Sequence, residues 1–82
     1  MIIKYKLKTN LLGRVAAQLV WELNQIDTSI NIISERMVNG KSLVGILSGN
    51  LRYGREIEIL FEKEEFLNKI IEVFNEVGDK ID

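Results

Sequence analysis

The sequence predicts an α+β domain in which helices cover one face of an open, four-stranded antiparallel sheet. Two observations support this fold class. Apolar residues alternate with charged ones in residues 3–8 and 56–61, as in half-buried strands, and they recur at helical spacing in residues 13–24 and 63–77. Strands with one charged face and helices with one apolar face satisfy each other most simply as two packed layers.

The first half of the chain contains a strand, a helix and two further strands. The first strand has apolar residues at positions 3, 5 and 7 and lysines at positions 4, 6 and 8. After Asn10 the apolar residues follow helical spacing, which predicts a helix over about residues 13–24. The β-branched segment Ser29–Ser34 predicts a second strand, and a short third strand is expected around Met37–Gly40.

The second half adds a short helix, a strand and a longer helix. A small apolar cluster follows Ser42, whose hydroxyl can cap a helix that ends at residues 49–50. Alternation returns in residues 56–61 as the fourth strand, and an apolar stripe predicts a final helix over about residues 63–77. The predicted order is therefore βαββαβα, and residues 79–82 are expected to fray.

Length and composition limit the classes of function to consider. A chain of 82 residues buries only about 60–65% of its unfolded surface, so we expect residues 1–82 to form a single domain around one core. The chain contains neither cysteine nor histidine, which excludes disulfide and thiolate chemistry and removes the usual ligands of zinc. We expect no metal site and no cofactor.

The charge balance argues against a general nucleic-acid binder. The net charge is −1, although residues 1–41 hold six basic and three acidic groups (+3) and residues 42–82 hold five basic and nine acidic groups (−4). No apolar stretch approaches the ~20 residues that span a bilayer, and the N-terminal segment does not resemble a signal peptide. We therefore expect a soluble cytoplasmic protein that binds neither nucleic acid nor membrane.

Two runs at predicted helix starts carry a recognisable pattern. They are Asn10-Leu11-Leu12-Gly13-Arg14-Val15-Ala16 and Asn39-Gly40-Lys41-Ser42-Leu43-Val44-Gly45. With Gly54 and the element order, these runs resemble the HPr family, the phosphocarrier proteins of the bacterial sugar phosphotransferase system, over nearly the whole chain. In character the sequence is most similar to Crh-like members, which lack the phospho-accepting histidine. The resemblance implies an HPr-like open-faced sandwich.

The position of Leu12 decides what the resemblance implies about catalysis. In the family, the first run has the form Gly-Leu-His-Ala-Arg-Pro-Ala, and phosphate passes from phosphoenolpyruvate through enzyme I to its histidine. Leu12 stands in that place and has no lone pair, and the chain offers no other histidine as an acceptor. We therefore expect neither phosphocarrier activity nor catalytic residues, and we do not expect the chain to be an enzyme.

The resemblance gives Ser42 a regulatory role. By itself, a serine before an apolar run is more often only a helix cap. In Gram-positive members of the family the equivalent serine is phosphorylated by HPr kinase/phosphorylase, and the product binds catabolite control protein A in carbon catabolite repression. Phosphate would add about −1.5 to −2 charges and three acceptor oxygens with little refolding. We expect Ser42 to be phosphorylated and then to bind a catabolite control protein A-like regulator or an enzyme.

The short helix after Ser42 is the candidate partner surface. Leu43, Val44 and Leu47 belong to two turns that cannot direct every apolar side chain inward, although some burial of Leu43 or Leu47 is expected.

Two basic residues are expected at the rim of this surface, Arg14 and Lys41. Arg14 is either an ordinary solvated charge or a ligand for a phosphate or for a partner's carboxylate. Trp21 is interpreted as ordinary packing, but an exposed Trp21 would extend the surface.

Two further signals fail on inspection. Gly40-Lys41-Ser42 is similar to the end of a phosphate-binding P-loop, but Glu35 stands where that motif needs its first glycine. Glu62, Glu64 and Glu65 are what a helix start favours without a bound cation. One alternative function stays open: an unmodified interaction module that docks on a pathway enzyme or a phosphotransferase component.

Overall fold

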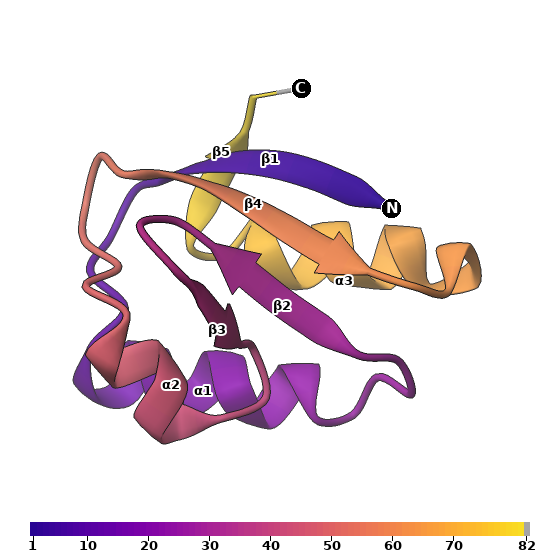
Figure 1. The fold of residues 1–82 in the computed structure, drawn as a ribbon, viewed down its shortest axis with the longest axis horizontal. Helices are drawn as coiled ribbons and strands as arrows, with labels where there is room; N and C mark the ends of the chain where they lie inside the picture. Colours follow the sequence, from indigo (N-terminus) through magenta and orange to yellow (C-terminus); the bar gives the residue numbers. More distant parts are fainter. Residues whose placement is uncertain (82) are drawn as a thin grey trace.

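In the computed structural model, which describes residues 1–81, all the strands join one antiparallel sheet (Figure 1). They are β1 (Ile2–Leu7), β2 (Ile30–Ile33), β3 (Met37–Asn39), β4 (Glu56–Phe61) and β5 (Gly78–Lys80). The strand order across the sheet is β3-β2-β4-β1-β5, so the two longest strands, β1 and β4, lie beside each other inside the sheet.

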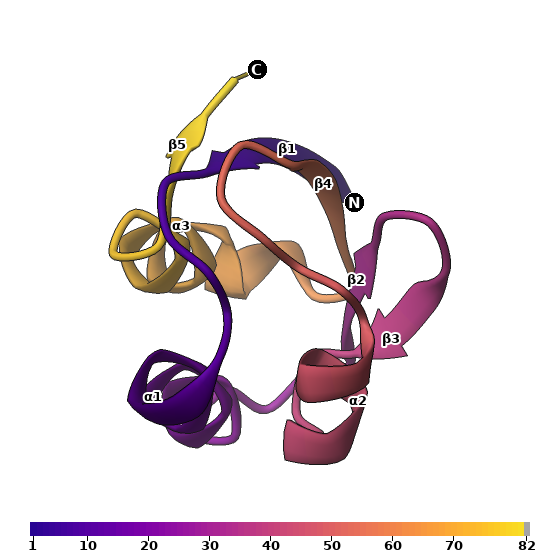
Figure 2. The same cartoon turned by 90° about the vertical axis from the view of Figure 1, so that its left-hand side faces the viewer.

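The helices lie on one side of this sheet, which leaves the other side open (Figures 1 and 2). They are α1 (Gly13–Leu23), α2 (Leu43–Ser48) and α3 (Leu67–Phe74), the last preceded by a 3-10 turn, η1 (Glu64–Phe66). Figure 2 shows the sheet as an arc above α1, α2 and α3. The α+β class and the helices on one face, as predicted from the sequence, are confirmed.

The core lies between the sheet and the helices because both contribute one apolar face to it. Alternate residues of β1 and β4 are buried, and α1 and α3 contribute their stripes. Tyr5, Phe61 and Phe74 are the largest fully buried side chains. Burying one such side chain stabilises the fold by about 1.5–3 kcal/mol. A shift of one residue between β1 and β4 would turn the buried side chains of one strand away from the core, so their burial fixes the register of this pair.

Two predictions about the C-terminal part are wrong. Residues 79–80 do not fray but belong to β5, which pairs with β1, so the sheet in residues 1–81 has five strands instead of four. The final helix is also shorter than predicted, because α3 spans residues 67–74 and residues 64–66 form a 3-10 turn.

Strand β5 is held by a close backbone contact at Gly78, which apolar alternation does not predict. A Cβ atom added to Gly78 would lie 2.7 Å from the carbonyl oxygen of Lys6, a distance that real Cβ atoms do not adopt. Hydrogen bonds on both sides of Gly78 extend the pairing, from the Lys8 amide to the Val77 carbonyl (2.9 Å) and from the Ile81 amide to the Lys4 carbonyl (2.9 Å). A three-residue strand held by close approach leaves no alternation to recognise.

Candidate functional site

Helices α1 and α2 lie side by side at one end of the molecule (Figures 1 and 2). A hydrogen bond joins the end of α1 to the start of α2, because Asn24 Nδ2 donates to the Lys41 carbonyl oxygen (3.1 Å) as well as to the Val20 carbonyl oxygen (2.8 Å). The predicted functional residues on the two helices are therefore held in a fixed relation.

Ser42 is the N-cap of α2, as predicted from the sequence. Its backbone is extended (φ −109°, ψ 117°), and its Oγ accepts a hydrogen bond from the Gly45 amide (3.1 Å). Its carbonyl oxygen accepts the first helical hydrogen bond, from the Ile46 amide (2.9 Å). The side chain is half-buried, so the hydroxyl combines a structural role with partial access to solvent.

Leu12 is the N-cap of α1 and provides no capping side chain. Its backbone is extended (φ −134°, ψ 162°), and Gly13 follows it in the left-handed region (φ +51°). The Leu12 side chain is exposed, whereas the preceding Leu11 is fully buried. An apolar side chain therefore meets solvent at the N-cap of α1.

Most apolar side chains of α2 are exposed. Ile46 is buried, but Leu43 and Leu47 are exposed and Val44 is 77% exposed. This confirms that two turns cannot direct every apolar side chain into the core. Trp21 on α1 is 62% exposed, so the interpretation of Trp21 as ordinary packing is wrong. We call these five exposed side chains, Leu12, Trp21, Leu43, Val44 and Leu47, the α1/α2 surface.

The sequence does contain a signal for the exposure of Trp21. The buried residues of α1 are Ala16, Leu19 and Leu23, which follow the helical spacing. Position 21 falls off that stripe, so periodicity alone places its side chain towards solvent. Tyr53, which is 73% exposed, was also missed; its amide donates to Asn10 Oδ1 (2.8 Å), in the loop that leads to α1. Its side chain lies in a loop, where no periodicity could indicate exposure.

Arg14 is exposed in the first turn of α1 and borders a groove of about 300 Å³. The groove is also lined by Val15, Leu19 and Val77, and it lies between α1 and the residues that follow α3. Gln18 and Glu76 complete the lining, so Arg14 lies beside apolar, polar and acidic side chains on the α3 side of α1. Its predicted contact with a phosphate or a partner's carboxylate stays a prediction.

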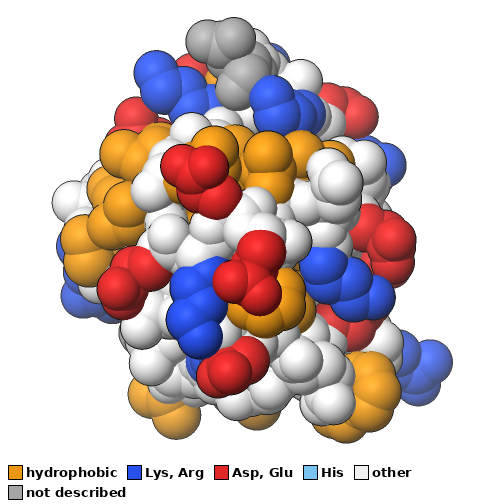
Figure 3. Space-filling view, turned by 90° about the vertical axis from the view of Figure 1, so that its right-hand side faces the viewer, with side chains coloured by type: hydrophobic (Ala, Val, Ile, Leu, Met, Phe, Trp, Pro, Cys, Tyr) orange, Lys and Arg blue, Asp and Glu red, His pale blue; other side chains and the backbone are white. Residues whose placement is uncertain are grey.

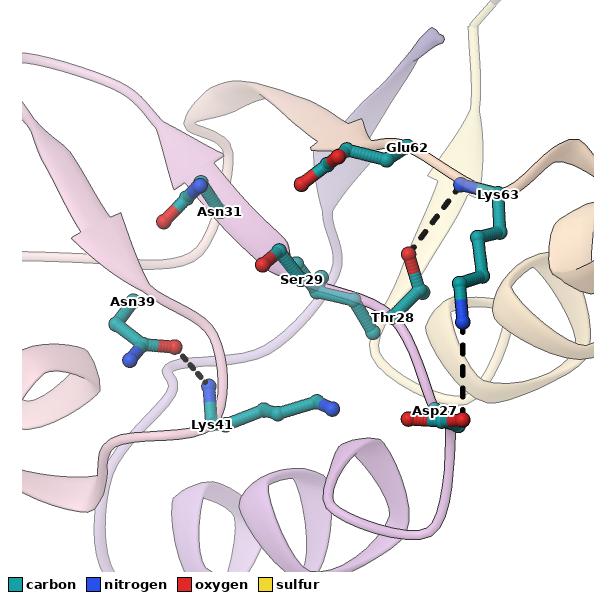
Figure 4. A pocket seen from close by; sticks show the side chains of 9 residues that line it. Asp27, Thr28, Ser29, Asn31, Asn39, Lys41, Glu62 and Lys63 are labelled. Atoms are coloured by element: carbon teal, nitrogen blue, oxygen red, sulfur yellow. Dashed lines mark hydrogen bonds and ion pairs between the residues drawn. The ribbon is translucent and has the colours of Figure 1, made fainter.

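Lys41 lies elsewhere than the sequence predicts. Its ammonium group donates a hydrogen bond to the Ile26 carbonyl oxygen, and its amide donates to Asn39 Oδ1 (2.9 Å). The side chain points into a polar pocket of about 440 Å³, towards Asp27 (Figure 4). Since the ammonium group is not free at the rim of the α1/α2 surface, direct contact between Lys41 and a partner stays a prediction, and its observed role is to anchor the start of α2.

Two of the four charged groups of that polar pocket form an ion pair, and a third, Lys41, donates to a carbonyl oxygen. Lys63 Nζ lies 3.7 Å from the Asp27 carboxylate, and the Lys63 amide donates to Thr28 Oγ1 (3.2 Å) (Figure 4). Glu62 lines the same pocket from the end of β4. The pocket therefore ties the turn after α1 to the end of β4, and its charges balance internally.

One pair of acidic groups perturbs the local electrostatics beside Arg14. The pKa of Glu76 is raised, first by a hydrogen bond with Glu22, then by desolvation and by the negative charges of Glu22 and Glu72, while Lys69 acts in the opposite direction. One Glu22 oxygen is buried without a hydrogen-bond partner. Two carboxyl groups in contact cannot both ionise without repulsion, which is why Glu76 holds its proton more readily than an isolated glutamate.

The comparisons with known proteins agree with this architecture. The family model for the PTS HPr component phosphorylation site matches residues 2–76. The chain belongs to the HPr family. Members of this family are phosphocarriers or regulators rather than enzymes. No curated protein matches the chain significantly.

Several solved structures of the HPr family resemble the chain over most of its length. HPr from Bacillus anthracis is 29% identical, with a TM-score of 0.79 and coverage of 94% of this chain and 93% of that one. HPr-C-His from Thermoanaerobacter tengcongensis is 26% identical, with a TM-score of 0.77 and coverage of 94% and 88%. Crh from Bacillus subtilis, described as a swapped, intertwined dimer, is 29% identical, with a TM-score of 0.66 and coverage of 87% of both chains.

Two properties of the observed site bear on its function. The chain contains no histidine at all, and the first turn of α1 presents Leu12 instead. The serine at the start of α2 is present and caps the helix.

No helix in residues 1–81 is long and apolar enough to cross a membrane.

Proposed function

We propose that this protein is a Crh-like regulator of the HPr family, controlled by phosphorylation of Ser42 by an HPr kinase/phosphorylase and without phosphocarrier activity. In this proposal the modified protein binds a catabolite control protein A-like transcription regulator or a metabolic enzyme in carbon catabolite control. The observation that carries the proposal is Ser42, a half-buried hydroxyl at the start of α2 beside the exposed α1/α2 surface, in a chain without histidine.

The chemistry at Ser42 requires little movement of the protein. The serine oxygen attacks the γ-phosphorus of ATP, the bond to the β-phosphate oxygen breaks, ADP leaves, and a base of the kinase takes the hydroxyl proton. The phosphate oxygens can then accept from the Gly45 amide in place of Oγ, since both lie at the same helix end. The partner would thus recognise an added charge on a nearly unchanged surface.

The α1/α2 surface supplies the apolar part of the binding site in this proposal. Leu43 and Val44 directly follow the modified residue, and Trp21 adds an aromatic side chain from the neighbouring helix. Exposed aromatic and aliphatic side chains next to a charge are typical of the centre of a protein interface. Truncating Val44 or Trp21 to alanine should therefore weaken partner binding without affecting phosphorylation or folding.

A kinase assay tests the proposal directly. The protein is incubated with HPr kinase/phosphorylase, ATP and Mg²⁺, and phosphate incorporation is measured by mass spectrometry. We expect one phosphate on the wild type and none on Ser42→Ala; the Ser48→Ala variant, which changes the exposed serine at the other end of α2, should react like the wild type. Equal labelling of the wild type and Ser42→Ala, or no labelling of either, would contradict the proposal.

The absence of phosphocarrier activity has its own test. With enzyme I and phosphoenolpyruvate, the wild type should remain unphosphorylated because the chain offers no imidazole. The Leu12→His variant restores an acceptor at an exposed position of the first turn of α1. Labelling of this variant alone would show that Leu12 occupies the acceptor position and that docking on enzyme I is retained.

A second candidate function is an unmodified interaction module that docks on a pathway enzyme or a phosphotransferase component. The observation in its favour is that the α1/α2 surface is already exposed without any modification. Binding measured with unmodified and phosphorylated protein separates the two candidates. Equal affinity of both forms for the partner would favour the module, and an affinity that appears only after phosphorylation would favour regulation.

A further inference from the structure

The open face of the sheet carries a pattern of side chains that neither the fold nor the α1/α2 surface explains. On the side away from the helices, β1 presents Ile2, Lys4 and Lys6, and Ile2 is 52% exposed. The neighbouring strand β4 presents Glu56, Glu58 and Leu60 on the same side. Two of these six side chains, Ile2 and Leu60, are apolar, and Ile2 would be buried only by something that covers the face.

The register places these side chains in three rows across the sheet. Leu60 lies opposite Ile2, Glu58 opposite Lys4, and Glu56 opposite Lys6. The Lys4 and Glu58 side chains form an exposed ion pair of 3.9 Å. Each row therefore combines one residue of β1 with its chemical complement on β4: apolar with apolar, and basic with acidic.

The flanking strands extend the middle row with apolar residues. Ile33 of β2 lies opposite Glu58, and the Ile81 amide donates to the Lys4 carbonyl oxygen on the far side of β1. Ile33 is half-buried and Ile81 is exposed. Both residues line a hollow of about 360 Å³ on this face, together with Lys4, Glu56 and Glu58. At the end of the molecule that lies at the right of Figure 1, hydrophobic side chains are exposed among acidic and basic ones (Figure 3).

This pattern is self-complementary under a two-fold rotation. An axis in the plane of the face, running along the strands between β1 and β4, exchanges the positions of these two strands. It places Lys4 of one copy over Glu58 of the other, Lys6 over Glu56, and Ile2 over Leu60. It also places Ile81 over Ile33, because β5 and β2 flank the central pair. Each of these four contacts joins apolar to apolar or basic to acidic groups.

We propose that the open sheet face binds a second copy of this chain, forming a face-to-face homodimer about the axis between β1 and β4. The face spans five strands about 4.8 Å apart and strands of up to about 20 Å, or roughly 400 Å² per copy. A total of about 800 Å² lies below the size of stable interfaces, so the dimer is weak and exchanges rapidly. The dimer leaves α1 and α2 free, because they lie on the opposite side of the sheet (Figure 2).

Other occupants of this face are less well supported. A nucleic acid or an anionic membrane would need an excess of basic side chains, whereas the two central strands present equal numbers of lysines and glutamates. A partner protein would need the matching alternation, and the chain itself already possesses it. The homodimer therefore follows from the charge pattern and not from apolar exposure alone.

Charge-reversal variants test the dimer. The variant Lys4→Glu/Lys6→Glu carries only acidic charges on β1 and β4, and Glu56→Lys/Glu58→Lys carries only basic ones. Each should be monomeric alone because its rows repel, and an equimolar mixture should form a 1:1 heterodimer tighter than the wild-type dimer. Sedimentation velocity from about 10 μM to about 1 mM covers the range in which weak association is measured. Circular dichroism verifies that each variant is folded.

A neutral substitution provides a check that does not alter charge. Ile2→Ser removes an exposed apolar group from both halves of the dimer and should weaken self-association about tenfold or more, while Val44→Ser on the other side of the molecule leaves it unchanged. The proposal is overturned if the mixture of charge-reversed variants remains monomeric at about 1 mM. It is overturned equally if the wild type forms a slowly exchanging dimer that tolerates both charge reversals, since that dimer would use another surface.

Discussion

Replacing Gly78 with alanine gives a quantitative test of how β5 is held. The new Cβ atom would lie 2.7 Å from the Lys6 carbonyl oxygen, 3.3 Å from the Lys6 carbonyl carbon and 3.4 Å from the Leu7 Cα atom. All three are backbone atoms, so no side chain can rotate away. Either β5 must move away from β1, or β1 must shift within the sheet.

The expected cost follows from this geometry. Overpacking in a well-packed region costs about 1–3 kcal/mol, and alanine returns about 0.4–1 kcal/mol by restricting the unfolded chain. We therefore expect Gly78→Ala to lower the free energy of unfolding by about 1–2 kcal/mol, which corresponds to a decrease in Tm of about 5–15 °C for a domain of this size. Val77, which is buried next to Gly78, should lose part of its packing as β5 moves.

Urea unfolding and thermal melting, both followed by circular dichroism, measure this change. Asp79→Ala is the matched control, since Asp79 is exposed in the same strand and its replacement should change the free energy of unfolding by less than about 0.5 kcal/mol. Hydrogen exchange measures the effect locally, because the Ile81 amide should lose protection from exchange in Gly78→Ala and keep it in Asp79→Ala. A Gly78→Ala protein as stable as the wild type would refute the argument from close approach.

Three further substitutions test single contacts. Ser42→Ala removes the side-chain cap of α2 and should cost about 1 kcal/mol in urea unfolding, with Ser48→Ala as the control. Tyr5→Phe removes the hydrogen bond from the Tyr5 hydroxyl to Asn75 Oδ1 (2.7 Å) and should cost about 1 kcal/mol; an unchanged stability would show that water replaces it. Glu76→Gln should raise stability at neutral pH by about 0.3 kcal/mol, because it removes repulsion from Glu22 and from Glu72, which stands four residues earlier. Since the pKa of Glu76 is raised on folding, its protonated form stabilises the fold at low pH, and this contribution is lost as pH rises from the ordinary value of 4.5 through the raised one. The advantage of Glu76→Gln in thermal melts should therefore disappear below that window, and an advantage independent of pH would contradict the assignment.

Periodicity predicted the parts of the fold in which one face meets the core and the other meets water. In β1 and β4 this condition holds over six residues each, which is long enough for alternation to be read. The cap at Ser42 was also predictable, because a serine side chain reaches the amide three residues later by local geometry alone. The same stripe of buried residues in α1 would have indicated that Trp21 is exposed.

The features that could not be predicted depend on contacts between distant segments. The pairing of β5 with β1 requires Gly78 to approach the Lys6 backbone across the sheet, and three residues carry no readable period. The direction of Lys41 depends on the position of the Ile26 carbonyl oxygen in the turn after α1. Local sequence does not contain the position of that oxygen, which also accepts a hydrogen bond from the Thr28 amide (2.9 Å).

The lengths of the strands determine how this sheet can grow. The outermost strands, β3 and β5, have only three residues each, whereas the six-residue strands β1 and β4 are enclosed on both sides. A second chain that added at either border would gain a ladder of three residues, and at β5 it would meet Asp79 and Lys80. Short, charged edge strands of this kind protect a sheet from edge-to-edge pairing with the strands of other chains. At high concentration the protein should therefore remain free of aggregates rich in intermolecular β-structure, even where its copies associate reversibly.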